Sequence, residues 1–341
     1  MFSLILIPLL AAMFLAINMG GSGTSPSFSA AYGANIIRKG LIPGLFGLFV
    51  FFGAIIAGKR VILTIGKGVL PEDAMSITMT TIILLSVGLA LLIANLLKIP
   101  QSTSQCTIFA LVGPAVYFNI LKTDKLFFEI IPTWFILPIV SFVVTLFIGR
   151  FIYKPIKQKG IIKFEEISAH PSLKVVVILA SCYVAFAIGS NNVANAAGPI
   201  VPMVLNELNI GAGESNFLLV MILSTLIVAP CFAIGSSIFG SKVAQTTGKE
   251  IVAFGPLGAV LISIVTATLL LVASLAKGIP TSLVQLNTAA IIGLGISKTR
   301  CKEVLSRTVV KKLLAVWLIA PLISLGLSFL LAIIANKVGL L

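Results

Sequence analysis

The feature that most constrains the fold is a series of apolar stretches, each close to the length that crosses a lipid bilayer. A membrane-spanning α-helix needs about 20 predominantly apolar residues. Ten candidate stretches lie at 2–35, 42–57, 74–98, 101–119, 128–152, 172–205, 216–239, 251–276, 281–297 and 313–338. They predict an all-α polytopic membrane protein. The stretches at 101–119 and 281–297 are short, so we expect them to be half-helices.

Composition excludes the other broad classes of protein. The chain of 341 residues is 58% hydrophobic and only 10% charged, whereas a soluble domain carries about 25% charged residues. Disorder requires low hydrophobicity and high net charge. The N-terminal stretch lacks a basic region and a small-residue cleavage site, so we interpret it as the first membrane helix and not as a signal peptide.

The basic residues predict the orientation of the chain in the cell membrane. The sequence has 24 Lys and Arg residues against 10 Asp and Glu, and cytoplasmic loops of membrane proteins collect Lys and Arg. With the N-terminus outside and the sides alternating, 17 basic residues lie inside. Seven lie outside: Lys59, Arg60, Lys67, Lys122, Lys125, Lys277 and Lys337. We therefore expect both termini outside the cytoplasm, and we predict no nucleic-acid partner for the positive charge.

The two halves of the chain resemble each other. The block Gly58–Lys67 matches Gly240–Lys249 at Gly, Val, Thr, Gly and Lys, and Ile99–Gln105 matches Ile279–Gln285 at nearly the same offset along the chain. Five stretches per half is an odd number, so the halves must have opposite orientations. Inverted repeats of this kind are typical of secondary transporters, which bind substrate near the midplane. The predicted division is a first repeat at 1–153, a cytoplasmic linker at 154–171 and a second repeat at 172–341.

Small polar residues interrupt two of the apolar stretches, at Asn18–Ser29 and at Gly189–Pro199. Runs of Gly, Ser, Asn and Pro disfavour a continuous helix, so we expect breaks there. Unwound backbone within a membrane lines a cavity or is buried in protein. A half-helix that begins at such a break presents free N–H groups and a positive dipole, which favour an anion.

The two Ile-Pro-x-Ser blocks predict a second pair of half-helix starts. Pro100 and Pro280 suit the first turn of a helix, and Ser102 and Ser282 add hydroxyl groups. Four half-helix N-termini that converge from inverted repeats would form a cage of neutral donors around a small oxyanion. For any single Ser or Gly, close helix packing is the alternative explanation.

The candidate substrate-binding residues come from these four blocks. They are Ser22, Gly23, Thr24, Ser25, Ser102, Thr103, Ser104, Ser190, Asn191, Asn192, Asn195, Thr281 and Ser282, with Gln105 and Gln285 as residues that orient the ion or brace the hairpins.

The sequence predicts neither a cofactor nor a metal centre, and no enzyme activity. The four cysteines have no Cys-x-x-Cys spacing, and the single histidine, His170, lies in the charged linker. All ten acidic residues lie in loops or near the ends of the apolar stretches. No candidate base for catalysis therefore lies within the membrane.

The segment Gly189–Pro199, GSNNVANAAGP, resembles the G-[AS]-N-D-V-A-N-A-x-G-P signature of the inorganic phosphate transporter family. The block at Gly58–Lys67 and the two Ile-Pro-x-Ser blocks also resemble that family, and the likeness extends over essentially the whole chain. The resemblance implies an anion transporter that forms a homodimer.

The sequence departs from the family pattern in a consistent direction. In the first block, Ser22 and Pro26 replace the two Asn residues of the family. Asn192 and Gly23 stand where the family has Asp, and Gln105 and Gln285 stand where it has His. Phosphate near neutral pH carries a proton that needs an acceptor, whereas sulfate carries none and would be repelled by a carboxylate. The same Asp residues would be expected to bind sodium, because hard cations prefer oxygen ligands.

These departures make the sequence resemble the sulfate permease branch of the family. We therefore predict a secondary transporter that moves sulfate by alternating access, with a proton favoured over sodium as the coupling ion. Two alternatives stay open at this stage: a carrier of phosphate or another tetrahedral oxyanion, and a passive anion channel.

Overall fold

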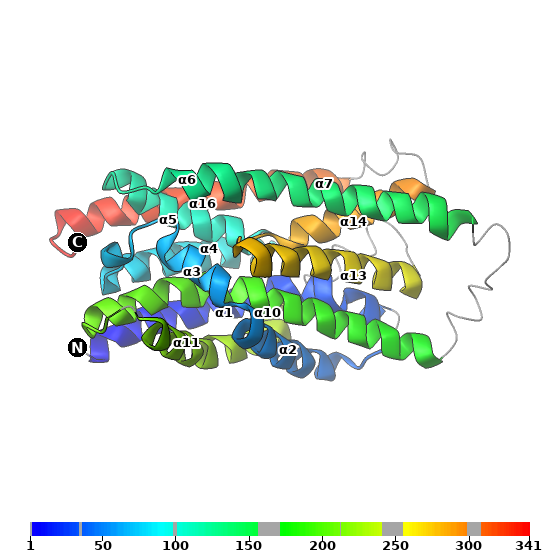
Figure 1. The fold of residues 1–341 in the computed structure, drawn as a ribbon, viewed down its shortest axis with the longest axis horizontal. Coiled ribbons are helices and arrows are strands. Elements are labelled where there is room, and N and C mark those ends of the chain that lie inside the picture. The colour runs from blue at the N-terminus through cyan, green and yellow to red at the C-terminus, as the bar shows by residue number, and fades with distance from the viewer. Residues whose placement is uncertain are drawn as a thin grey trace.

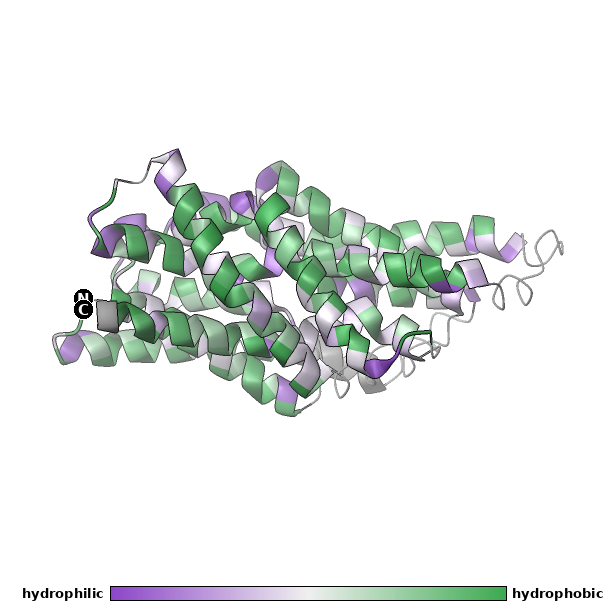
Figure 2. Cartoon of the chain, turned by 90° about the horizontal axis from the view of Figure 1, so that it is seen from below, coloured by the Kyte–Doolittle hydropathy of each residue, from purple (hydrophilic) through white to green (hydrophobic). Residues whose placement is uncertain are grey.

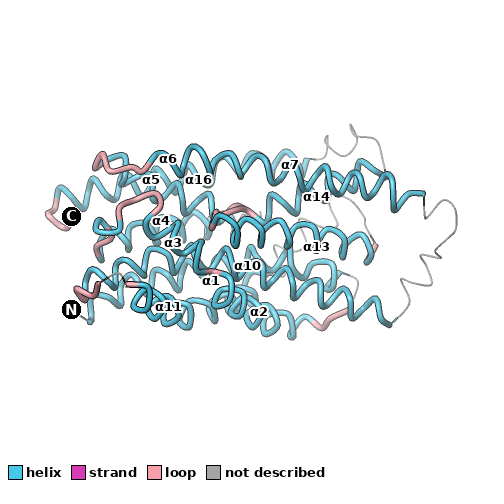
Figure 3. Tube along the Cα trace, in the orientation of Figure 1, coloured by secondary structure: helices cyan, strands magenta, loops and turns pink. Residues whose placement is uncertain are grey.

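The protein is an elongated bundle of helices, seen here in a computed structural model (Figures 1 and 3). The structure describes residues 2–33, 36–97, 101–155, 171–211, 213–240, 255–298 and 308–341, and among them every regular element is helical. The helices are α1 (Phe2–Gly33), α2 (Ile42–Ala57), α3 (Lys59–Lys67), α4 (Ile77–Leu96), α5 (Thr103–Tyr117), α6 (Thr123–Lys125), α7 (Ile131–Phe147), α10 (Pro171–Glu207), α11 (Glu214–Gly235), α13 (Pro256–Val272), α14 (Leu283–Lys298) and α16 (Thr308–Lys337). Short π-helical turns lengthen three of them, at Leu126–Ile130 and Ile148–Tyr153 around α7, at Ser236–Gly240 after α11 and at Ala273–Lys277 after α13. Two 3-10 turns lie at Lys39–Leu41 and Glu72–Ala74.

The structure confirms the all-α membrane architecture. Among the described residues, eight helical segments are long and apolar enough to cross a bilayer. Helices α5 and α14 have 15 and 16 residues, which at 1.5 Å per residue gives about 23 Å, short of the roughly 30 Å hydrocarbon core. These are the two stretches that the sequence predicts to be half-helices.

The outer surface of the bundle is apolar, as a lipid environment requires. Figure 2 shows hydrophobic residues along the flanks of the long helices. Large apolar side chains are strongly exposed there, with Phe128 80% exposed, Leu318 72% and Ile56 69%. Continuous apolar surface of this kind marks contact with a membrane or a partner. Both chain termini lie at one end of the long axis in Figure 1.

Each predicted half of the chain packs against the other half. Helix α5 packs against α16 and α14 against α7, while α1 packs against α11 and α10 against α2. Helix α5 ends beside α16, where Asn336 donates to the Tyr117 hydroxyl at 3.0 Å. Helix α14 ends at the other end of the bundle, where Lys298 lies over the Tyr153 ring. The inverted repeat and its boundaries stay a prediction, and most of the linker, residues 156–170, lies outside the described residues.

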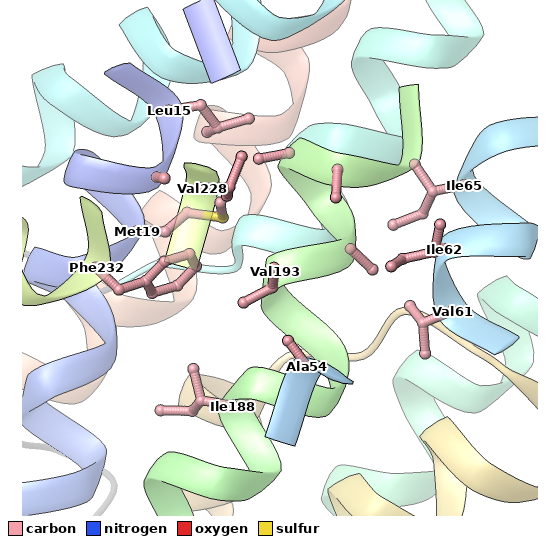
Figure 4. Close-up of a cluster of buried hydrophobic side chains, with 14 of the residues drawn as sticks. Leu15, Met19, Ala54, Val61, Ile62, Ile65, Ile188, Val193, Val228 and Phe232 are labelled. Carbon is pink, nitrogen blue, oxygen red and sulfur yellow. The ribbon is translucent and has the colours of Figure 1, made fainter. Parts of the chain in front are cut away.

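Helix α10 is the central element of the core. Figure 4 shows Ile188 and Val193 of α10 between two groups of apolar side chains. One group comes from α3 (Val61, Ile62 and Ile65), and the other comes from α1 and α11 (Leu15, Met19, Val228 and Phe232). All of these side chains are at most 1% exposed.

The prediction of helix breaks at Asn18–Ser29 and Gly189–Pro199 is wrong. Helices α1 and α10 continue through both blocks. Several of their hydroxyl groups bond within the helix: Ser22 donates to the Met19 carbonyl at 3.1 Å, Thr24 to Gly20 at 2.7 Å and Ser190 to Ala187 at 2.8 Å. Ser and Thr commonly bond back to the preceding turn in this way.

The glycines of these blocks serve close helix contacts. A Cβ on Gly20 would lie 2.2 Å from the Phe232 carbonyl oxygen, and one on Gly189 would lie 2.0 Å from that of Val50. Small residues allow membrane helices to approach to this distance. The structure therefore has two half-helix N-termini at its centre, those of α5 and α14, and not four.

Candidate functional site

Helices α5 and α14 begin at the two Ile-Pro-x-Ser blocks, each capped by the serine. The Ser102 hydroxyl accepts a hydrogen bond from the Gln105 N–H at 3.3 Å, and the Ser282 hydroxyl accepts one from the Gln285 N–H at 3.3 Å. Serine is a favoured N-cap residue because it satisfies a donor that has no intrahelical partner. The other N–H groups of each first turn have no acceptor within the helix. Pro100 lies outside the described residues.

A small cavity lies against the N-terminal turns of both half-helices. Its volume is about 10 Å³, close to the least that holds one water molecule, so the cavity is closed in this conformation. The residues that line it are Ser22, Gly23, Pro26, Gln101, Thr103, Ile188, Asn192, Ser282, Leu283 and Val284. All four sequence blocks contribute to this wall, and none of these residues is charged. The cavity therefore combines helix N-termini with neutral polar groups.

Five of the predicted site residues line this cavity: Ser22, Gly23, Thr103, Asn192 and Ser282. Gln101 also lines it, although the sequence prediction omits it. The alignment of the two Ile-Pro-x-Ser blocks places Gln101 opposite Thr281, which the prediction includes. The repeat that makes Thr281 a candidate therefore makes Gln101 a candidate as well.

Asn191 joins α10 to the loop that precedes α14. Its side-chain Oδ1 accepts hydrogen bonds from the Thr281 N–H at 2.9 Å and the Ser104 hydroxyl at 3.3 Å. Its Nδ2 donates to the Ser274 hydroxyl at 2.9 Å and the Ile279 carbonyl at 3.0 Å. With four hydrogen bonds the amide is fully used, so Asn191 holds the site together and does not face the cavity.

A second set of hydrogen bonds supports the first turn of α5. The Asn195 Nδ2 donates to the Thr103 and Ser104 hydroxyls at 3.4 and 3.3 Å. The Ser104 hydroxyl also lies 3.2 Å from the Thr281 carbonyl oxygen and shares its one proton between that oxygen and the Asn191 Oδ1, so it connects the starts of both half-helices. The Ser190 hydroxyl lies 3.3 Å from that of Ser274. These residues form the polar layer behind the cavity.

Helix α7 anchors α14 from the outside. The Trp134 indole N–H donates to the Pro280 carbonyl at 2.8 Å, and the Ser141 hydroxyl donates to the Leu286 carbonyl at 2.9 Å. Both side chains are buried. Because a buried indole N–H needs a partner, Trp134 fixes the approach of the loop to α14. Neither residue belongs to the four blocks from which the site is predicted.

Gln105 and Gln285 pair with each other where the two half-helices meet. Each amide donates to the oxygen of the other, at 3.3 and 2.9 Å. Thr24 contributes to a different cavity, and Ser25 is fully buried without lining the central one. These four candidates therefore lie around the central cavity and not on its wall.

Three buried amide oxygens near the cavity have no hydrogen-bond partner among the described residues. They are Oε1 of Gln101 and Oδ1 of Asn192 and Asn195. A buried polar atom left unpaired costs about 1–3 kcal/mol. Two of the three belong to the cavity wall, so this is where a group from outside the chain would find partners.

Comparison with known proteins places most of the chain in one family. The sequence model described as the phosphate transporter family matches residues 19–328. The sulfate permease CysP of Bacillus subtilis is 36% identical over 327 residues, which cover 95% of this chain and 86% of that protein. A solved structure described as "The sodium-dependent phosphate transporter" has the same fold, with a TM-score of 0.80 at 20% identity, covering 98% of this chain and all of that one. These proteins are transporters and not enzymes, and we conclude that the chain belongs to the phosphate transporter family.

Proposed function

We propose that this anion transporter carries sulfate across the cell membrane by alternating access, and that the ion binds in the cavity between the N-terminal turns of α5 and α14. The observation that carries the proposal is the composition of that wall, which joins two helix N-termini to hydroxyl and amide groups and includes no carboxylate. A helix N-terminus stabilises an anion through its free N–H groups and its dipole.

Sulfate fits this wall better than an anion that carries a proton. A fully ionised oxyanion only accepts hydrogen bonds, so it needs donors around it. Thr103 and Ser282 supply hydroxyl groups, and a flip of the Asn192 side-chain amide would turn its NH₂ group to the position of its unpaired oxygen. The name of the 36% identical relative, a sulfate permease, also supports sulfate.

Phosphate is the second candidate, and the unpaired amide oxygens favour it. Hydrogen phosphate donates one hydrogen bond, and the oxygens of Gln101 and Asn192 on the cavity wall are free acceptors. The structural neighbour is also named as a phosphate transporter. The two candidates therefore differ in whether those amides face the ion with oxygen or with nitrogen.

A proton is the coupling ion that we propose, because the cavity wall offers no carboxylate of the kind that would bind sodium.

We further propose that both termini face away from the cytoplasm and that the protein forms a homodimer. The basic residues of the loops support the orientation, and the family resemblance supports the dimer. A passive channel is the alternative to a carrier.

Uptake of radiolabelled sulfate into proteoliposomes tests the proposal. We expect saturable uptake, acceleration by an imposed pH gradient, counterflow, and weak inhibition by equal phosphate. Absence of saturable sulfate flux would refute a sulfate carrier. Strong inhibition by phosphate would favour the second candidate, flux without saturation or counterflow would indicate a channel, and indifference to the pH gradient would exclude proton coupling.

A further inference from the structure

A second and larger cavity lies where α1 ends, next to the start of α2 and the π-helical turn after α11. Its volume is about 340 Å³. It reaches the protein surface, because Lys39 and Gly40 on its wall are exposed. The proposed function gives this cavity no role.

The polar groups of this cavity suit an anion. Lys39 lines it, and among the described residues no carboxylate pairs with that ammonium group. Ser236 also lines it, and among the described residues its hydroxyl has no hydrogen-bond partner, although the residue is only 4% exposed. The start of α2 adds no free donor, because the Ile42 N–H already donates to the Lys39 carbonyl and Pro43 has no N–H. A cation without a carboxylate partner and a hydroxyl without a hydrogen-bond partner together favour an oxyanion.

Two aromatic rings lie between this cavity and the central one. Phe28 lines the outer cavity, and its ring packs edge-on against that of Phe46, with 6.5 Å between centroids and 84° between planes. The Phe46 ring reaches Gly23 on the wall of the central cavity, where a Cβ would lie 3.0 Å from its Cζ atom. Thr24, the next residue of α1, already belongs to the outer cavity.

We propose that the outer cavity is a second oxyanion-binding site. Lys39 and Ser236 hold the transported ion there before it enters the central cavity or after it leaves. The Phe28–Phe46 pair closes the passage between the two sites. This inference rests on the proposed function and adds a site to it. The same chemistry would also bind the phosphate of an anionic lipid headgroup, so the test must separate the two sources.

Gly40 allows a test in which charge is the only difference between two variants. A Cβ on Gly40 would meet no atom within 4 Å, so the position accepts a side chain. Gly40→Glu places a carboxylate on the cavity wall, and Gly40→Gln is the neutral control of the same size. We expect Gly40→Glu to raise the apparent KM for sulfate about three- to tenfold over Gly40→Gln, for flux that starts from the face bearing Lys39. Lys39→Gln should also raise that KM, with saturable flux retained in both variants.

The outcomes separate the inference from the proposed function. Absence of saturable flux by the unmodified protein removes both. Saturable flux with equal KM values for Gly40→Glu and Gly40→Gln, and no change in Lys39→Gln, overturns the second site alone. An effect of these variants that occurs only in liposomes with phosphatidylglycerol assigns the cavity to a lipid phosphate and also overturns the proposal. An effect in neutral liposomes that weakens as ionic strength rises supports it.

Discussion

The side-chain amides of Gln105 and Gln285 donate hydrogen bonds to each other, at 3.3 and 2.9 Å, where the N-terminal turns of α5 and α14 meet. The two residues occupy equivalent places in the two Ile-Pro-x-Ser blocks, one in each half of the chain. A carboxamide carries both a donor and an acceptor, so two of them satisfy each other without any charge. The pair fixes the meeting point of the two half-helices.

We expect the Gln105–Gln285 pair to show energetic coupling. Gln105→Leu or Gln285→Leu alone leaves a buried amide without its partner, whereas the double substitution removes both polar groups. The double variant should therefore lose less stability than the two single variants together, with a coupling of about 1 kcal/mol. Denaturation of the purified protein in detergent measures this, and strict additivity would contradict it.

Asn191 should be more important for folding than for contact with the ion. Asn191→Ala leaves the Thr281 N–H without the acceptor it has here, at a cost of about 1–3 kcal/mol if that group stays unpaired, whereas the Ile279 carbonyl keeps the Thr281 hydroxyl as a donor at 3.2 Å. We expect a lower unfolding temperature. Asn206→Ala is the matched control, because that amide also bonds to backbone carbonyls but at the protein surface. Equal losses in both variants would contradict the structural role of Asn191.

The half-helices could be predicted from the sequence because their signals are local. A Pro and a Ser before a short apolar stretch mark a helix start, and the same block recurs in the second half of the chain. The apolar stretches could likewise be predicted, because the thickness of the bilayer sets the length that each needs. These features need no knowledge of how the helices pack.

The continuity of α1 and α10 could not be predicted, since it depends on neighbouring helices. Gly20 and Gly189 weaken an isolated helix, but here they admit the backbones of α11 and α2. Similarly, Asn191 and Asn192 are adjacent, yet only Asn192 lines the cavity. Successive residues of a helix point about 100° apart, and the rotation of α10 in the bundle decides which one faces the cavity.

Asn192→Asp should weaken sulfate transport, because it adds a negative charge beside a dianion. We expect at least a tenfold rise in the KM for sulfate, equivalent to about 1.4 kcal/mol. Phosphate gives the internal control, since a carboxylate can accept the proton of hydrogen phosphate. Phosphate flux should therefore fall less than sulfate flux in the same proteoliposomes. An unchanged affinity for sulfate would show that residue 192 does not face the bound ion.

The crossing of α2 and α10 should tolerate no methyl group at its glycines. A Cβ on Gly189 would lie 2.0 Å from the Val50 carbonyl oxygen, and one on Gly53 would lie 1.9 Å from that of Phe186. These oxygens belong to helix backbones, so they cannot turn away as a flexible side chain could. We therefore expect Gly189→Ala to abolish a monodisperse folded peak in size-exclusion chromatography. Gly326→Ala in α16 is the matched control: its Cβ would meet no atom within 4 Å, and alanine should raise stability by about 0.5–1 kcal/mol. An unchanged unfolding temperature of Gly189→Ala would contradict this prediction, because it would mean that α2 and α10 cross at a greater distance than the structure shows.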